Sequence, residues 1–290
     1  MFDLNAIDAE LTRLGLGSVN QVSQLGGGDT TGGYRIACES GDVFMKFGQA
    51  SCEDMFSAEA DGLEELAGAG VIRVPAVHGC GRVCRSAYLA MEYLPFDTDV
   101  SAADGALGDA MAKLHRTTSD RHGWHRHNTI GFTPQPNPPT ADWIDFFARH
   151  RLEHQLRIAF AKGHDGVLVS FGQRLVDQIA DFFRGYTPSP SLLHGDLWSG
   201  NRACVAGEPV IFDPAVYFGD READIAMTQL FGGFRPEFLE AYEASWPMAD
   251  GYELRSDLYK LYHVLNHLNL FGGSYYDQSV SLCRKLLASV

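Results

Sequence analysis

The segment that starts at Leu192 and ends at Asp213 constrains the fold and the chemistry more than any other. Two apolar residues, Leu192 and Leu193, lead into a polar loop that carries Asp196 and, further on, Asn201. A β-rich apolar run then ends on a second carboxylate, Asp213. Phosphoryl transfer from a nucleotide needs a carboxylate that orients the attacking hydroxyl, and an amide and a carboxylate that hold Mg²⁺. The spacing therefore predicts Asp196 as catalytic base, with Asn201 and Asp213 as metal ligands.

A purely structural interpretation stands beside this one. Asp and Asn favour turns, so Asp196 and Asn201 could cap a turn, and Asp213 followed by Pro214 could end a strand. Elements earlier in the chain help to decide, because a phosphotransferase also needs groups that bind the nucleotide phosphates.

The composition of this 290-residue chain is that of a globular protein, with one large domain or two lobes that share a cleft. The formal net charge of −14 argues against nucleic acid and anionic membranes as partners. Six scattered cysteines without a Cys-x-x-Cys pair indicate free thiols in a reducing cytosol. We find no basic leader before an apolar run, and no stretch of about 18 apolar residues. We therefore expect a cytoplasmic protein, with a monomer favoured.

The first part of the chain predicts a small sheet with a glycine-rich loop. We expect a helix at 5–16, strands at 19–25, 34–38 and 43–47, and a helix at 54–66. The loop after the first strand contains Gly26, Gly27 and Gly28, and the missing Cβ lets backbone N–H groups approach phosphate oxygens. A simple hairpin turn is the alternative.

Lys46 is a charged residue between large apolar neighbours in the third of these strands. A buried lysine needs an anionic partner, and a phosphotransferase supplies the nucleotide phosphates and a helix glutamate. On the next helix, Glu59 stands at helical spacing from Phe56 and Leu63, so it faces the core. We therefore pair Glu59 with Lys46. The alternative is an edge-strand lysine that protects against aggregation.

The rest of the chain completes the sheet and then becomes mainly helical. We expect strands at 71–75 and 87–94, an irregular loop at 122–140, and helices at 107–115, 143–160, 168–183, 223–231, 236–244, 253–271 and 280–290. A sheet-bearing part followed by a helical part predicts an α+β fold.

The octapeptide from His194 to Asn201 resembles the signature of the fructosamine kinase family, a branch of the protein-kinase-like small-molecule kinases. Blocks at 55–60, 111–116, 128–131, 143–147, 212–215, 219–227 and 258–262 are also similar to the family. The resemblance implies a two-lobed protein-kinase-like fold, with an N-lobe at residues 1–92 and a helical C-lobe at residues 93–290. It also implies that MgATP phosphorylates a ketosamine, of the fructosamine or ribulosamine type, at the third hydroxyl of its sugar. The unstable product then releases the free amine, which deglycates amines or proteins.

The resemblance further implies where the nucleotide binds, and the position of one aromatic residue indicates where the sugar binds. Residues 91–94 look like the hinge of a protein kinase, where the C=O of Glu92 and the N–H of Leu94 bind adenine. Trp198, beside the base, is the candidate platform for the sugar. A buried Trp198 that only packs the loop is the alternative.

Departures from the protein-kinase pattern argue against two kinds of control. Gly195 stands where protein kinases have the Arg that receives an activation-loop phosphate, Pro214 replaces the Phe of their metal-binding motif, and no Ala-Pro-Glu follows. We therefore do not expect control by activation-loop phosphorylation. Asp29 stands where several relatives carry a redox-active Cys, so we do not carry over a redox switch.

Two rival functions remain. Another small-molecule kinase of the same fold, acting on aminoglycosides, choline or homoserine, is disfavoured by the insert at 197–200. A catalytically inactive nucleotide-binding scaffold is disfavoured by the complete set of Lys46, Glu59, Asp196, Asn201 and Asp213.

Overall fold

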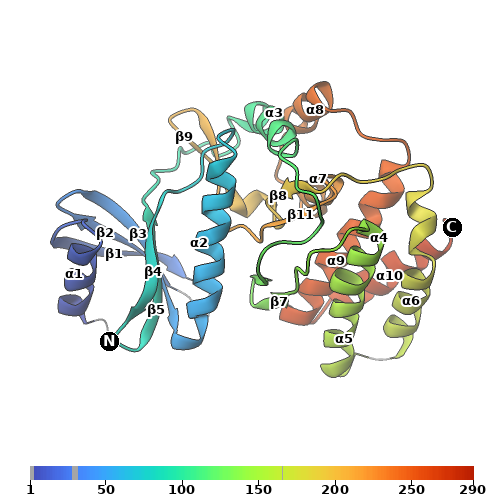
Figure 1. Cartoon of the computed structure of the whole chain (residues 1–290), viewed down its shortest axis with the longest axis horizontal. Coiled ribbons are helices and arrows are strands. Elements are labelled where there is room, and N and C mark those ends of the chain that lie inside the picture. Colours follow the sequence, from blue (N-terminus) through green and yellow to red (C-terminus); the bar gives the residue numbers. More distant parts are fainter. Residues whose placement is uncertain (1–2, 28–31, 165) are drawn as a thin grey trace.

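The computed structural model describes residues 3–27, 32–164 and 166–290, which form two lobes (Figure 1). The small lobe holds an antiparallel sheet with two helices, and the larger lobe is mostly helical. The predicted two-lobed α+β arrangement is therefore confirmed. The sheet ends at Glu92, where the sequence placed the boundary between the lobes; the division into domains at that residue stays a prediction.

The small lobe is built on one five-stranded antiparallel sheet in the order β1-β2-β3-β5-β4. Its strands are β1 Val19–Gly27, β2 Gly32–Cys38, β3 Gly41–Gln49, β4 Val77–Val83 and β5 Ser86–Glu92. Strand β3 pairs with β2 on one side and with β5 on the other, where Lys46 stands opposite Leu89. Lys46 therefore starts from the middle of the sheet, and the alternative of an edge-strand lysine is wrong.

The alternation along β3 separates an apolar face from a face toward the cleft. One set of β3 side chains packs with the helix α1 (Leu4–Arg13): Val43, Met45 and Phe47. Because successive side chains point to opposite faces of a strand, Lys46 points the other way. That second face is covered by α2 (Glu53–Gly68), which carries Glu59 and stands between the sheet and the helical lobe (Figure 1).

One strand prediction is wrong. The segment 71–75 is not part of the sheet, although Arg73 forms an isolated bridge with Val210, and β4 is the strand beside β5. Pro75 explains the difference, because proline lacks the N–H that a ladder needs. Val74 is buried all the same, so burial without pairing produced the apolar pattern. Strand β4 itself contains two glycines and gives a weak pattern.

The larger lobe contains eight α-helices within the described residues: α3 Asp104–Leu114, α4 Trp143–Phe147, α5 Glu153–Ala161, α6 Gly166–Asp177, α7 Glu222–Leu230, α8 Pro236–Ser245, α9 Tyr252–Phe271 and α10 Tyr275–Leu287. Three short strand pairs accompany them: β6 Asn128–Ile130 with β7 Thr133–Gln135, β8 Ser191–Leu193 with β11 Tyr217–Gly219, and β9 Arg202–Val205 with β10 Glu208–Ile211. Across the described ranges, no helix is both long and apolar enough to cross a membrane.

The helix predictions are confirmed in type, with differences at the ends. The helix expected at 143–160 contains a π-helical turn, Ala148–Leu152. The helix expected at 168–183 stops early and continues as a 3₁₀ turn, Ile179–Phe183. Helix α10 begins at Tyr275 rather than at residue 280, because its first turn is mostly polar and gives no periodic signal. The loop expected at 122–140 contains the β6–β7 hairpin.

An aromatic cluster around Trp143 fixes the strands that flank the catalytic segment. The Trp143 ring lies 5.6 Å from the Phe146 ring and 6.5 Å from the Tyr217 ring, and its indole N–H donates to the Tyr259 hydroxyl at 3.0 Å. Tyr217 belongs to β11 and pairs with Leu193 of β8. The core of the helical lobe thus holds β8, the strand from which the loop with Asp196 starts.

Candidate active site

Asp196 lies in a loop whose backbone is held by one buried carboxylate, Asp224 of α7. Asp224 accepts hydrogen bonds from the backbone N–H of His194 at 2.7 Å and of Gly195 at 2.9 Å. His115 lies 3.2 Å from the same carboxylate. Burial alone would raise the pKa of Asp224, but the hydrogen bonds from His115 and from the Gly195 N–H hold the pKa below its usual range. Asp224 is a charged anchor for the loop, and sequence reasoning did not identify it.

Gly195 shows why this loop departs from the protein-kinase pattern. Its φ of +82° lies in the left-handed region that favours glycine. A Cβ there would come within 2.0 Å of the Ala215 carbonyl oxygen, and the Ala215 N–H donates to the His194 carbonyl at 2.8 Å. The catalytic loop and the segment after Asp213 touch too closely for any side chain at position 195.

His194 ties the same two segments together. Its Nε2 lies 3.0 Å from the Phe212 carbonyl, and its Nδ1 lies 3.2 Å from the Asp196 backbone N–H. The pattern assigns the proton to Nε2, which donates, while Nδ1 accepts. Burial lowers the pKa of His194, so the ring is neutral and positions Asp196 without adding charge.

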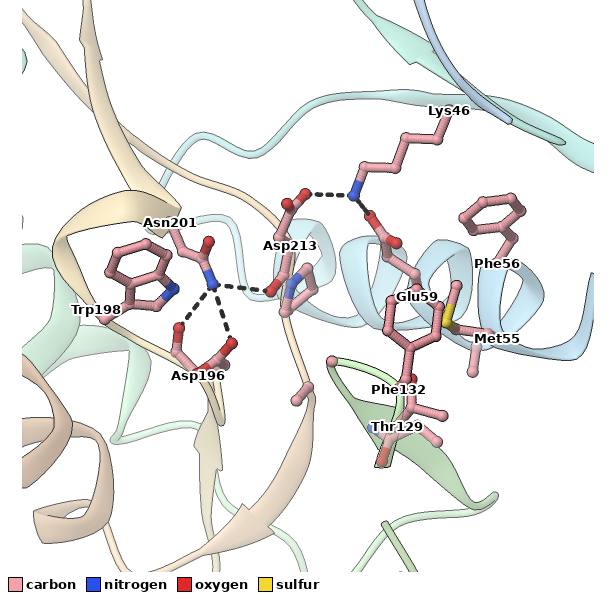
Figure 2. Close-up of a pocket in the computed structure, with 15 residues that line it drawn as sticks. Lys46, Met55, Phe56, Glu59, Thr129, Phe132, Asp196, Trp198, Asn201 and Asp213 are labelled. Atoms are coloured by element: carbon pink, nitrogen blue, oxygen red, sulfur yellow. Dashed lines mark hydrogen bonds and ion pairs between the residues drawn. The ribbon is translucent and has the colours of Figure 1, made fainter. Parts of the chain in front are cut away.

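Asp196, Asn201 and Asp213 meet in the cleft (Figure 2). The Asn201 amide N–H group donates to the Asp196 carbonyl at 2.9 Å, to the Asp196 carboxylate at 3.3 Å and to the Asp213 carbonyl at 3.3 Å. Its amide oxygen points away from Asp196 (Figure 2). Asp213 has a φ of +56°, a conformation that non-glycine residues adopt mainly where surrounding structure enforces it, often at functional sites. The three predicted residues are brought together, with an amide and a carboxylate oxygen of the kind that Mg²⁺ prefers.

The environment of Asp196 gives it an unusual proton affinity. Burial raises its pKa to about 7, and the negative charges of Asp213 and Asp224 contribute to the rise. A general base works best when its pKa lies near the operating pH. Such a pKa suits the role of catalytic base, which stays a prediction for Asp196.

Lys46 bridges two carboxylates that are distant in sequence (Figure 2). Its Nζ lies 2.6 Å from Glu59 Oε1 and 2.5 Å from Asp213 Oδ1. Burial alone would lower the pKa of Lys46, but the charges of Asp213 and Glu59 outweigh it and raise the pKa, so the amine is protonated. The predicted pairing of Lys46 with Glu59 is confirmed.

A first cleft, the hinge pocket, has a volume of about 450 Å³ and is mainly apolar. Its apolar lining includes Leu25, Phe44, Met91, Leu94, Phe96 and Phe212. The rings of Phe96 and Phe212 stack with centroids 5.1 Å apart. Glu92 also lines the pocket, and its carboxylate pairs with Arg73 at 2.6 Å. Glu92 and Leu94 thus lie where an adenine-binding hinge is expected, and their role stays a prediction.

The glycine-rich loop is only partly described. Gly26 and Gly27 end β1 and pair with Gly33 and Gly32 of β2. Gly28 lies outside the described residues. Binding of phosphates by this loop therefore stays a prediction.

A second cleft, the acceptor pocket, has a volume of about 270 Å³ and adjoins the first at Lys46 and Asp213. Trp198 lines it and is 39% exposed, so the ring is not buried, and its role as a platform for the sugar stays a prediction. Phe132, in the β6–β7 turn, also lines the pocket and is 49% exposed. In Figure 2 the two rings lie toward opposite ends of the pocket, with Asp196 and Asp213 between them. Sequence reasoning missed Phe132, because a single aromatic residue in a loop carries no periodic signal.

Comparison with known proteins fits this geometry. The fructosamine kinase family model matches residues 6–289. A protein of Synechocystis sp., provisionally named a ketoamine kinase, is 42% identical, covering 93% of this chain and 91% of its own length. A protein of Oryza sativa subsp. indica, named a chloroplastic protein-ribulosamine 3-kinase, is 39% identical, covering 91% of this chain and 78% of its own length.

Comparison with solved structures indicates the same family. A crystal structure from Thermobifida fusca, provisionally named a fructosamine-3-kinase, has a TM-score of 0.89 at 30% identity and covers 98% of this chain and 99% of its own. An aminoglycoside phosphotransferase in complex with ADP and hygromycin B has a TM-score of 0.67 at 15% identity, covering 98% of both chains; this likeness shows the protein-kinase-like fold alone. The chain belongs to the fructosamine kinase family.

Proposed function

We propose that this protein is an ATP-dependent kinase that phosphorylates a sugar hydroxyl of ketosamines. The observation that carries the proposal is the meeting of Asp196, Asn201 and Asp213 with the Lys46–Glu59 pair where two pockets join. Membership of the family supports a ketosamine as the acceptor, of the fructosamine or ribulosamine type.

The hinge pocket suits the nucleotide. Its apolar walls fit a flat base, and the backbone groups of Glu92 and Leu94 would bind the adenine edge. Lys46 also lines the pocket and, as a protonated amine, neutralises phosphate charge while Glu59 holds it in place.

The metal would be held by Asn201 and Asp213. The donor set fits Mg²⁺, because the Asn201 nitrogen is occupied by Asp196 and Asp213 while its oxygen points away from Asp196. When bound, Mg²⁺ neutralises and orients the phosphates.

Asp196 performs the proton transfer. Its carboxylate accepts the proton of the sugar hydroxyl as the hydroxyl oxygen bonds to the terminal phosphorus of ATP. The bond between that phosphorus and the bridging oxygen breaks, and ADP leaves with the charge that Lys46 stabilises. The neutral His194 and the charged Asp224 hold Asp196 in place throughout.

The acceptor pocket suits a sugar that carries an amine. Three carboxylates line it, Glu59, Asp196 and Asp213, against the one ammonium of Lys46, so a cationic amine is favoured over an anionic acceptor. Trp198 and Phe132 offer exposed ring faces for the apolar face of a sugar and for the cation. Phosphorylation of the third hydroxyl, followed by loss of the amine, would make the reaction a deglycation.

The proposal is tested by ATP consumption and ³¹P NMR with a glycated-lysine mimic, compared with the free sugar, the free amine and an aminoglycoside. We expect ADP and a sugar phosphate from the glycated lysine, and at most slow turnover of the others. Preferred turnover of the aminoglycoside or of the free sugar would overturn the proposal. Asp196→Ala is the control for a contaminating kinase.

A further inference from the structure

Arg126 connects the helical lobe to α2, the helix that carries Glu59. Its guanidinium donates to Asp54 Oδ1 at 2.6 Å, to Ser57 Oγ at 3.0 Å and to the Asp61 carboxylate. These three positions are three and four residues apart, so they share one face of α2. Glu59 lies between them in sequence and faces Lys46. One side chain of the helical lobe thus grips α2 on both sides of Glu59.

A second contact extends this grip along α2. The indole N–H of Trp124 donates to the Glu65 carboxylate at 3.2 Å, and the Trp124 side chain is buried. Residues 124–137, which contain the β6–β7 hairpin, therefore hold more than two turns of the helix.

The base of Arg126 is itself fixed in the helical lobe. The Asn137 side chain donates to the Arg126 carbonyl at 3.3 Å and to Asn128 Oδ1 at 2.8 Å. Arg151, which is fully buried, donates to Asn137 Oδ1 at 2.7 Å. The backbone of Arg126 is therefore held in position by a buried polar network.

The same residues hold the segment after Asp213. Asn128 donates to the Val216 carbonyl at 2.8 Å, and Gln135 donates to the Ala215 carbonyl at 3.1 Å. Lys46 pairs with Glu59 of α2 and with Asp213. Residues 124–137 thus contact both α2 and the segment that follows Asp213.

We propose that residues 124–137 are a permanent brace, and that Arg126 is a positioning residue that keeps Glu59 against Lys46. The chain has Gly195 and Pro214 where protein kinases carry residues used in activation-loop control. In their absence, the contacts of residues 124–137 hold α2 where Glu59 pairs with Lys46. The inference rests on the proposed kinase function, which it deepens.

The variant Arg126→Met removes both ion pairs but keeps the aliphatic stem. We expect kcat to fall about 10- to 100-fold, because small displacements of a catalytic constellation are costly. The KM for the ketosamine should change little. Arg126→Lys keeps the charge but not the fork that reaches several acceptors, so it should lie between wild type and Arg126→Met. It also replaces Arg126→Met if that variant does not fold.

A charge exchange tests the contact itself. Arg126→Asp combined with Asp61→Arg restores one ion pair in reverse and should recover part of the activity that Arg126→Asp alone loses. Arg149→Met is the matched control, since Arg149 pairs with Asp145 on the surface of the helical lobe at 2.6 Å and should be active at the wild-type level.

A double-mutant cycle with Glu59→Gln separates positioning from simple stabilisation. If Arg126 acts through Glu59, Arg126→Met should cost about 10- to 100-fold in the wild-type background but less than about 3-fold in the Glu59→Gln background. Equal losses in both backgrounds, or an Arg126→Met enzyme within twofold of wild type, would overturn the proposal.

Hydrogen exchange gives a readout that needs no turnover. Amides of α2 around Glu59 should exchange faster in Arg126→Met than in wild type and in Arg149→Met. Unchanged exchange would contradict the brace. If the wild type fails to phosphorylate ketosamines while α2 loosens as expected, only the proposed function fails.

Discussion

The hinge pocket and the acceptor pocket share Lys46 and Asp213 but are otherwise lined by side chains of different kinds. The hinge pocket is apolar and is formed largely by strands and by the chain between the lobes. The acceptor pocket combines carboxylates and two exposed rings from helix α2 and from separated loops. A flat base can be bound by apolar walls and backbone groups, whereas a sugar that carries an amine needs charge and oriented contacts. We therefore expect the acceptor pocket to determine which acceptor is phosphorylated, and the hinge pocket to bind the nucleotide.

The largest effect is expected from Asp196→Ala, which removes the base from the acceptor pocket only. Positioned acid–base groups contribute about 10²- to 10⁴-fold, so kcat should fall by that factor. Affinity for a non-hydrolysable ATP analogue, measured by calorimetry, should stay near that of wild type. An enzyme that keeps a tenth of its rate would refute the role of Asp196.

Asp213→Ala alters a residue that lines both pockets and should therefore affect both substrates. Loss of a charged metal ligand should lower kcat by about 100-fold and weaken MgATP binding. Asn201→Ala should be milder, by about tenfold, because an amide carries no net charge. Titration of Mg²⁺ against each variant measures the effect, and an unchanged Mg²⁺ requirement in Asp213→Ala would exclude it as a ligand.

The pH profile should distinguish the pockets. Because the pKa of Asp196 is raised to about 7, the carboxyl is protonated below that pH and cannot act as a base. The value of kcat/KM for the ketosamine should then rise about tenfold per pH unit up to about pH 7 and level off above it. Binding of an ATP analogue in the hinge pocket should show no comparable acid limb. A rate that stays flat down to about pH 5 would contradict this role.

The smallest effects concern the aromatic walls. Trp198→Ala and Phe132→Ala should each raise the KM for the ketosamine about 2- to 30-fold and leave the KM for ATP unchanged, since such contacts are worth about 0.5–2 kcal/mol. Phe96 is a matched control, because it is also 49% exposed but lines the hinge pocket. Phe96→Ala should raise the KM for ATP alone. A common fall in kcat and melting temperature in the Trp198 and Phe132 variants would instead assign these rings to packing.

The meeting of the candidate site residues was more predictable than the contacts that support them. That Lys46, Glu59, Asp196 and Asn201 lie together could be predicted because phosphoryl transfer restricts both residue type and spacing, and the apolar neighbours of Lys46 already required a partner. Their catalytic roles stay predictions. Asp224 could not be assigned a role, because it meets its partners, two backbone N–H groups and the His115 ring, only through the tertiary fold.

The sequence also contained no signal for Arg126 or Phe132. Arg126 meets α2 only through the tertiary fold, and Phe132 is a single ring in a turn. The strand prediction at 71–75 was wrong because Val74, before Pro75, is buried without pairing in the sheet. Sequence patterns report local periodicity and reaction chemistry, whereas positioning depends on residues that meet from distant segments.

The most direct test is a crystal structure of Asp196→Asn with a non-hydrolysable ATP analogue, Mg²⁺ and a glycated-lysine mimic. The account predicts adenine in the hinge pocket, with the sugar hydroxyl that receives the phosphate about 3 Å from the side chain at position 196. The sugar and its amine should lie in the acceptor pocket, between Trp198 and Phe132. A ketosamine bound outside the acceptor pocket, or one whose hydroxyls all lie far from position 196, would contradict it.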